Sequence, residues 1–433
     1  MNYFKEEILN GIKIHSINTD KFKTNLIAIF LTTPLSKEYI TFDSLLSATL
    51  RRGSKNYNSQ EEISKRLEDM YGAEFDCGLD KIGDNHVLKF YLESVNDKFL
   101  PENSENIFKA SLDMLFDLVF NPLIEDNAFK KEYVNQEKEI MKQRINSKKD
   151  NKAAYAKMRC IEEMYKNEPT SLYKFGYVED LEKIDNKNLY EYFKKLVDEC
   201  KIDIFVSGNL QNVDYKEYII KKIAEFNLKK RNPNFILNKL TKKDEVKTEN
   251  IVTENLDVVQ GKLIIGLDIL FNEEDIKNPN IKYQTILYNS ILGGSANSKL
   301  FQNVREKASL AYTASSSYSR FKSNIFISCG IEIKNYDKAL EIIRKQIEDM
   351  KKGEFTKEEI ENVKKGIISS IMTIEDEPDS AIVYFFSQDL QNSNEDIKEY
   401  IEGIKAVTKE QIINIANKIK INTIYFLSNN TQI

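Results

Sequence analysis

Apolar and polar residues follow two periods along the first half of the chain, an extended one at its start and a helical one after it. Residues 11–33 contain two runs rich in β-branched and apolar residues, which predict two strands. Four residues at helical spacing predict a helix that Pro122 ends: Phe108, Leu112, Leu115 and Val119. Further strands are expected at 73–81, 85–94 and 202–208, and further helices at 41–52, 126–147, 151–165 and 187–198.

The second half repeats this order of elements after a polar and charged segment, 229–250, which is predicted to be a linker. Strands are expected at 262–270, 310–318, 323–333 and 423–428, and helices at 280–292, 298–307 and 339–350. Capping-box pairs open one helix in the first half and two in the second: Ser59 with Glu62, Thr356 with Glu359, and Thr408 with Gln411. The chain is therefore predicted to be α+β, with two similar halves, 1–228 and 251–433, each a sheet with helices packed on it.

Composition narrows the class of protein without identifying it. The 63 basic and 68 acidic residues are interleaved and give a net charge of −5, which does not favour binding to nucleic acid or to an anionic membrane. No run of 18 apolar residues is present, and charges occupy the place of a signal peptide's apolar run. The four cysteines form no CxxC pair that would indicate a thiolate metal site. We therefore expect a cytoplasmic protein.

Histidine is scarce, and this restricts the available chemistry. The sequence has two histidines, His15 and His86, so any histidine base or histidine-rich metal site must use one of them. Each lies in an extended run with ordinary neighbours, which favours a hydrogen-bonded or solvated strand residue over a catalytic one. Phosphate-binding GxxxxGK[ST] and GxGxxG loops and the GxSxG nucleophile motif are all absent from the sequence.

The segment from Gly293 to Tyr312 carries the most specific pattern in the chain. A glycine pair at 293–294 is followed by Leu300-Phe-Gln-Asn-Val-Arg305-Glu and then by Leu310-Ala-Tyr312. This pattern resembles the C-terminal half of the insulinase / mitochondrial processing peptidase family. The resemblance implies that each half is a mostly antiparallel sheet backed by helices, and that pairs of halves enclose a chamber for peptides.

Active members of that family carry an inverted zinc motif, His-x-x-Glu-His, on a helix before a Gly-Thr/Ser pair. Its two histidines bind zinc and its glutamate activates water. With Gly53-Ser54 as the anchor, the ligand positions fall on Ser44 and Ala48 and the base falls on Ser47. A methyl group cannot bind a cation, and a serine hydroxyl is a poor zinc ligand and no base at neutral pH. The resemblance therefore implies that the zinc motif is lost.

The family's third zinc ligand is a glutamate on a later helix, in a stretch that resembles Glu137-Lys-Glu-Ile-Met-Lys-Gln-Arg144. Without a gap in the alignment, Arg144 occupies the ligand position and places a positive charge where the metal would lie. A slip of one helical turn would bring Glu137 or Glu139 nearer, still without histidines. We therefore expect no bound metal and no other cofactor.

The family's substrate-holding residues match Arg305 and Tyr312, which hydrogen-bond the substrate backbone near the scissile bond in active members. A guanidinium group and a phenol both donate to a peptide carbonyl and to a developing oxyanion. Heterodimeric bacterial members divide the site, with zinc on one chain and the Arg and Tyr on the other. This chain is similar to the second kind, and in layout and composition to the partner subunit associated with the elongation factor P 5-aminopentanol modification.

Three functions follow from these observations. The first is a non-catalytic subunit that contributes Arg305 and Tyr312 to a paralogous chain carrying the zinc, with a peptide or small protein as substrate. The second is a stand-alone peptide- or protein-binding protein without proteolysis, and the third is an enzyme with a different site, which the shortage of histidine disfavours. Homodimerisation of the isolated chain remains open.

Overall fold

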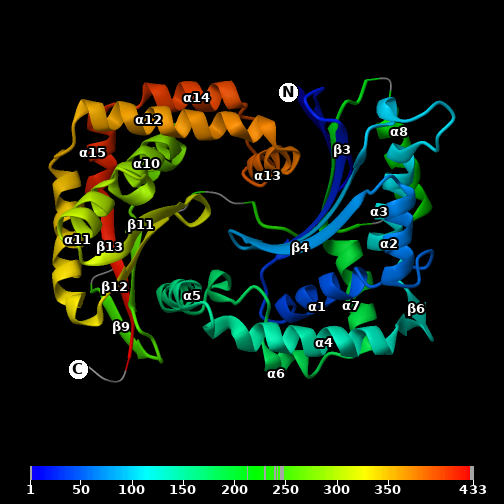
Figure 1. Cartoon of the computed structure of the whole chain (residues 1–433), viewed down its shortest axis with the longest axis horizontal. Helices are drawn as coiled ribbons and strands as arrows, with labels where there is room; N and C mark the ends of the chain where they lie inside the picture. Colours follow the sequence, from blue (N-terminus) through cyan, green and yellow to red (C-terminus); the bar gives the residue numbers. More distant parts are fainter. Residues whose placement is uncertain are drawn as a thin grey trace. The chain divides into compact units, whose positions relative to one another are not determined.

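The computed structural model describes residues 2–211, 213–228, 231–237, 240, 242–243 and 248–429. The contacts of the chain divide it into two compact units, each built on its own sheet (Figure 1). Unit 1 contains Met1–Asn146, Leu172–Leu237 and Ile374–Ser393, and unit 2 contains Ser147–Ser171, Asn238–Thr373 and Asn394–Ile433. Both units combine a sheet with helices, which confirms the predicted α+β class.

The sheet of unit 1 has six strands in the order β1-β2-β8-β3-β5-β4. Their bounds are Asn2–Leu9 (β1), Ile12–Asn18 (β2), Thr24–Pro34 (β3), Glu74–Ile82 (β4), Asn85–Val95 (β5) and Lys201–Gly208 (β8). Among these strands only β2 and β8 run parallel, and the other neighbours are antiparallel. The sheet is thus mostly antiparallel, as the family resemblance implied.

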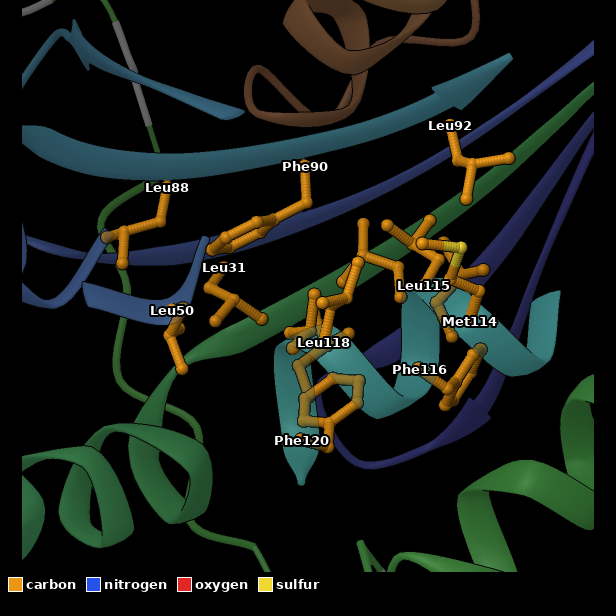
Figure 2. Packing of buried hydrophobic residues seen from close by; sticks show 14 of the residues in the cluster. Leu31, Leu50, Leu88, Phe90, Leu92, Met114, Leu115, Phe116, Leu118 and Phe120 are labelled. Carbon is orange, nitrogen blue, oxygen red and sulfur yellow. The ribbon is translucent and has the colours of Figure 1, made fainter. Parts of the chain in front are cut away.

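Helices cover one face of this sheet. They are α1 (Ile40–Leu50), α2 (Gln60–Asp69), α3 (Ile107–Phe120), α4 (Lys131–Asn146), α6 (Val178–Leu181), α7 (Asn186–Glu199) and α8 (Tyr215–Glu225). Figure 2 shows Leu88, Phe90 and Leu92, alternate residues of β5, pointing from one face of the sheet toward α3. Successive side chains of a strand point to opposite faces, so this spacing places all three in the same core.

The other face of the unit 1 sheet is covered by α13 (Pro378–Asp389), which comes from the C-terminal part of the chain. Phe386 of α13 packs edge-on against Phe30 of β3, with the ring centroids 4.8 Å apart, and against Phe205 of β8 at 6.3 Å. Every residue of β8 is buried. A strand buried on both faces needs a second covering layer, and α13 supplies it.

The sheet of unit 2 has five strands in the order β11-β12-β10-β13-β9. Their bounds are Asn250–Asn255 (β9), Gly261–Ile269 (β10), Ala311–Ser319 (β11), Asn324–Ile331 (β12) and Ile419–Ser428 (β13). Its helices are α9 (Glu273–Lys277), α10 (Ile281–Asn289), α11 (Tyr336–Lys351), α12 (Lys357–Met372), α14 (Ile397–Ala406) and α15 (Lys409–Asn417), with π-helical turns at Ser290–Gly294 and Phe301–Lys307. Leu263, Ile265 and Leu267 of β10 face the core that these helices share.

The second face of the unit 2 sheet is covered by α5 (Lys152–Met164), which comes from the N-terminal part of the chain. Tyr155, Ala156 and Cys160 of α5 form a buried cluster with Ile264 of β10 and with neighbouring strands. Gly266 lies beneath α5, because a Cβ atom there would come within 2.7 Å of the Met164 sulfur. The helix and the strand therefore pack at close range.

The two compact units differ from the sequence halves, because each unit takes one helix from the other half. The predicted division at 1–228 and 251–433 follows the chain, whereas the contacts assign α5 to unit 2 and α13 to unit 1. Part of the predicted linker lies outside the described residues. Within the described part, Arg231 donates to the carbonyl of Val197 at 3.0 Å in unit 1, whereas Lys243 pairs with Asp268 in unit 2.

Several elements are absent from the sequence prediction, including β9, α9, α13 and α14. Two further differences, both in unit 1, have a local cause. The strand β1 is absent from the prediction, because its residues are charged and half exposed at the edge of the sheet. The helix expected at 126–147 begins only at Lys131, because Asp126 and Asn127 adopt left-handed backbone conformations. These two residues form the turn of a short hairpin, Ile124–Glu125 (β6) with Ala128–Phe129 (β7), as Asx residues often do.

Candidate functional site

Unit 1 contains a cavity of about 260 Å³ lined by α1, α4 and β4. The structure brings together here the four positions that the sequence assigned to the lost zinc site, which we call the motif positions: Ser44, Ser47, Ala48 and Arg144. Ser44 and Ala48 are four residues apart on α1 and so share a helix face. Glu137 and Arg144 likewise share one face of α4.

The serines at the motif positions have no zinc-binding or basic character. The Ser44 hydroxyl lies 3.0 Å from the carbonyl oxygen of Ile40 and 3.0 Å from that of Lys174, so backbone acceptors use its proton. Ser47 is buried, and its side chain hydrogen-bonds with that of Cys77. Ala48 presents a methyl group. None of these side chains can deprotonate a water molecule near neutral pH.

Arginines dominate the electrostatics of the cavity. Arg51, Arg52 and Arg144 all line it, and Glu137 is the one carboxylate among its lining residues. Burial raises the pKa of Glu137, while the three arginines act in the opposite direction. Arg52 Nη1 lies 3.4 Å from Glu137 Oε1, and the Arg144 guanidinium lies over the Phe175 ring, 5.1 Å from its centroid. A dication in this cavity would face three positive charges.

Cys77 of β4 also lines the cavity, and burial raises the pKa of its thiol. A thiol of this kind is neutral near pH 7, whereas the thiolate is the nucleophile and the metal ligand. The position therefore supports neither cysteine catalysis nor thiolate ligation. Glu139, the alternative that a slip of α4 would have brought in, is not among the lining residues.

The second pair of predicted residues, Arg305 and Tyr312, lies in unit 2 and is exposed. The Arg305 side chain is 44% exposed, stacks over the Phe301 ring at 4.6 Å and lies 3.6 Å from the Glu306 carboxylate. Tyr312 is 73% exposed. This exposure leaves the ring and the hydroxyl of Tyr312 accessible to another molecule.

Local backbone geometry produces this exposure. The π-helical turn that carries Arg305 ends at Lys307, and Ser309, two residues beyond it, has a φ of 52°. The Leu310 amide donates to the Val304 carbonyl at 3.1 Å, which closes the helix end in a Schellman-type arrangement. Two residues on, the register of β11 against β12 shifts between Ala311 and Thr313, so Tyr312 is the extra residue of a β-bulge. Bulges re-aim side chains and are frequent next to functional sites.

The glycine pair upstream has a packing role. A Cβ atom on Gly293 would lie 2.6 Å from the Ser316 amide of β11, closer than real atoms approach. The Ser316 hydroxyl lies 2.8 Å from the Asn289 side-chain oxygen, which fixes the end of α10 against the same strand. The glycine therefore lets the preceding π-helical turn contact β11, which carries Tyr312 near its start. This explains the pattern without a phosphate-binding role.

His15 and His86 are both buried strand residues. In His15 one ring nitrogen contacts the Tyr3 hydroxyl and the other contacts Asp203, each at 2.8 Å. Burial lowers the pKa of His15, although Asp203 acts in the opposite direction. His86 Nδ1 lies 2.8 Å from Asp43. Both histidines have partners within unit 1, in agreement with the interpretation of hydrogen-bonded strand residues.

His15 belongs to a set of charged side chains between β1, β2, β8 and α13, which we call the charge network: Lys5, Lys13, His15, Lys201, Asp203 and Asp389. Lys201 and Asp389 are each 1% exposed at the side chain and lie 2.9 Å apart. His15, Asp203 and Asp389 are close enough to suggest a cation site. Because the Lys201 ammonium pairs with both carboxylates, it already occupies the position of the cation.

The sequence analysis named the motif positions but missed two other features of unit 1. It did not find that Arg51 and Arg52 join Arg144 in one cavity, although their adjacency to Ser47 and Ala48 at the end of the same helix was a usable signal. It also missed the charge network, since Lys5 and Asp389 are separated by 384 residues. No local pattern connects them.

A sheet-and-helix fold of this layout, with no zinc-binding side chain at the motif positions, defines an inactive metallopeptidase-like protein. The family model described as the Peptidase M16 inactive domain matches residues 183–367. The chain is 34% identical over 417 residues to "Probable inactive metalloprotease YmfF" of Bacillus subtilis (strain 168), with 96% of each chain covered. It is 24% identical over 317 residues to "Uncharacterized zinc protease YmxG" of the same strain, with 71% of this chain and 72% of that one covered.

Among solved structures, a conserved protein from Enterococcus faecalis V583 matches with a TM-score of 0.90 and 27% identity over 100% of both chains. The chain belongs to the M16 peptidase family, as one of its inactive, metalloprotease-like members. The narrower resemblance to the partner subunit of elongation factor P modification stays a prediction. No helix in the described residues is long and apolar enough to cross a membrane.

Proposed function

We propose that this chain is the substrate-holding, non-catalytic subunit of a two-chain zinc peptidase. In this proposal Arg305 and Tyr312 bind the backbone of a peptide whose bond is cleaved at the zinc of a paralogous chain. The carrying observation is that both side chains are exposed in unit 2, while the zinc-motif positions of unit 1 hold serine, alanine and arginine.

The presentation of the pair supports a contact role. Tyr312 is turned outward by a bulge and Arg305 lies on the last turn of a closed helix end, so neither is part of the core of unit 2. A guanidinium group and a phenol donate hydrogen bonds to a carbonyl oxygen and to the oxyanion that develops from it. Donors of this kind are useful only where another group supplies the attacking water.

The relatives supply a second line of support. One organism, Bacillus subtilis, has both a relative named an inactive metalloprotease and a relative named a zinc protease. A cell that carries both kinds of chain provides the two components that the proposal requires. The natural partner to test is therefore the zinc-motif paralogue encoded by the same genome.

The experiment mixes the purified chain with that paralogue and measures hydrolysis of a quenched fluorescent peptide library. We expect no hydrolysis by the chain alone, hydrolysis by the mixture, and loss of this activity with a chelator. Arg305→Ala and Tyr312→Phe should each lower kcat/KM of the mixture by about 10²-fold, the loss typical of an oxyanion donor. Co-purification of the two chains should be unaffected.

Lys307→Ala is the matched control, because it removes a charge from the same helical turn, where Lys307 contacts only Asn303 at 3.2 Å among the described residues. Its turnover should equal that of the wild type. Chelator-sensitive hydrolysis by the isolated chain would refute the proposal. Peptide binding without stimulated hydrolysis in any mixture would instead favour the stand-alone binding protein.

A further inference from the structure

The cavity at the erased zinc site has the opposite charge preference from a metal site. Its lining includes three guanidinium groups, from Arg51, Arg52 and Arg144, against the single carboxylate of Glu137. The other lining residues are uncharged. A metal site gathers negative or neutral donors around a cation, whereas this cavity gathers positive N–H donors around an empty space.

Arg51 and Arg52 retain donor capacity for a ligand. Arg51 makes no ion pair or hydrogen bond with any residue that the structure describes, and its side chain is exposed. Arg52 bonds with Gln136 and lies near Glu137, yet its Nε is buried without a hydrogen-bond partner in the described part of the chain. A buried N–H without an acceptor is destabilising, so an oxygen ligand here would be favourable.

Arg144 and Ser47 add to this donor set. The Arg144 guanidinium lies over Phe175, which orients its plane, and the N–H groups of a guanidinium lie in that plane. Ser47 contributes a buried hydroxyl on the α1 side of the cavity. Guanidinium forks fit carboxylate and phosphate oxygens in pairs, which makes oxyanions the matching ligand class.

The size and walls of the cavity limit what carries the anion. A volume of about 260 Å³ is slightly below the range of roughly 300–1,000 Å³ that is typical of small-molecule sites. Leu79, Ile140 and Met141 supply apolar wall on the β4 and α4 sides. The space fits an oxyanion on a group of a few carbon atoms, such as an acidic side chain or a small phosphate.

We propose that the cavity formed by Arg51, Arg52, Arg144 and Ser47 is an oxyanion-binding site for a carboxylate or phosphate borne by a small group. The anion would bind at the place where the family resemblance puts the zinc of active members. The proposal does not rest on the subunit function, since binding is a property of the isolated chain. It also assigns a ligand to unit 1.

The test measures binding to the purified full chain by isothermal titration calorimetry and by the shift in Tm. The probes are inorganic phosphate and N-acetylaspartate, with chloride at equal ionic strength as the reference. Saturable binding of either probe above chloride is the expected result. Binding of phosphate alone identifies a phosphate source, binding of N-acetylaspartate alone identifies a carboxylate source, and binding of both identifies a general oxyanion site.

Charge variants then test the location of the site. Arg51→Gln and Arg144→Gln should each weaken binding by about tenfold or more, the loss expected for one charge-assisted hydrogen bond. Glu137→Gln should strengthen binding, because it removes the one negative charge of the lining. A variant that merely loosened the fold could not produce opposite effects at these positions.

Lys194→Gln is the control, since Lys194 is an exposed residue of α7 paired with Glu191 and does not line the cavity. Its binding should match that of the wild type. The proposal is overturned if neither probe binds above chloride, if Arg51→Gln and Arg144→Gln bind as the wild type does, or if the control loses as much as they do. Saturable zinc binding that Glu137→Gln abolishes would also overturn it.

Discussion

Asp389→Ala should destabilise unit 1 far more than an ordinary helix substitution. Asp389 lies at the end of α13 and pairs with Lys201 at 2.9 Å, with Lys5 at 2.8 Å and with Lys13 at 3.0 Å. The substitution leaves three ammonium groups beside the one carboxylate of Asp203. Lys201 is 1% exposed at the side chain, so water cannot replace the missing partner.

The magnitude follows from the burial of each pair. Removal of one partner from a buried ion pair costs about 3–5 kcal/mol, because the remaining charge stays desolvated. Lys5 and Lys13 are each 21% exposed, so their share is smaller than that of Lys201. We therefore expect the free energy of unfolding of unit 1 to fall by about 3–5 kcal/mol, with most of the loss arising from the Lys201 pair.

The assay is urea unfolding followed by far-UV circular dichroism, since the chain has no tryptophan to report by fluorescence. Hydrogen exchange should locate the loss in α13 and the strands under it. Asp379→Ala on the same helix is the matched control, because Asp379 is exposed and its removal should cost no more than about 1 kcal/mol. In a double-mutant cycle, Lys201→Met with Asp389→Ala should cost less than the two single losses combined.

The reasoning is refuted if Asp389→Ala costs no more than Asp379→Ala. It is also refuted if the losses from Lys201→Met and Asp389→Ala are additive, because additive losses would mean that the two side chains do not interact. A large loss confined to unit 2 would contradict the assignment of α13 to unit 1.

Two further predictions concern pH and metal. Burial acts to raise the pKa values of Asp203 and Asp389, but the Lys201 ammonium holds both below their usual range. Burial lowers the pKa of His15. A group whose pKa is lowered by folding stabilises the fold at any pH above its pKa in the unfolded state, and this stabilisation is lost as the pH falls. The free energy of unfolding should therefore decline first below about pH 6.5 through His15, and more steeply below about pH 4 through the aspartates. Urea unfolding across about pH 3–8 checks this. In the Asp389→Ala variant the acid loss should be smaller, and an unchanged acid slope would contradict the assignment. The triple substitution Ser44→His, Ser47→Glu and Ala48→His should give weak zinc binding while Arg144 remains. Adding Arg144→Glu should raise the zinc affinity by at least about tenfold, because it replaces a repelling charge with a ligand. Competition with a chromophoric chelator measures both affinities, and equal affinities would show that Arg144 does not approach the metal position.

Much of the local structure follows from short stretches of sequence. The capping boxes at Thr356 with Glu359 and at Thr408 with Gln411 form as predicted, because a cap uses side chains three residues apart. Ser59 likewise caps α2 by accepting from the Glu62 amide at 3.2 Å. The prediction was wrong at the start of α4, where a turn of two residues with left-handed backbone delays the helix.

The gathering of the motif positions in one cavity also follows from helical spacing in the sequence. Helical spacing on α1 places Ser44 beside Ala48, and the same spacing on α4 places Glu137 on one face with Arg144. The four residues that alignment to the family motif selects all line the same cavity. The substrate-holding role of Arg305 and Tyr312 stays a prediction, and the bulge that turns Tyr312 outward requires the pairing of β11 with β12.

Only the tertiary structure decided which helix covers which sheet. Apolar residues on both faces of β8 and β10 indicate that helices must cover both faces of each sheet, but they do not identify the second helix. The contacts give α13 to unit 1 and α5 to unit 2, although each helix lies far along the chain from the strands that it covers. The charge network and the arginine-lined cavity depend on such distant contacts as well, because the energy of a buried charge is set by its neighbours in space and not by its neighbours in sequence.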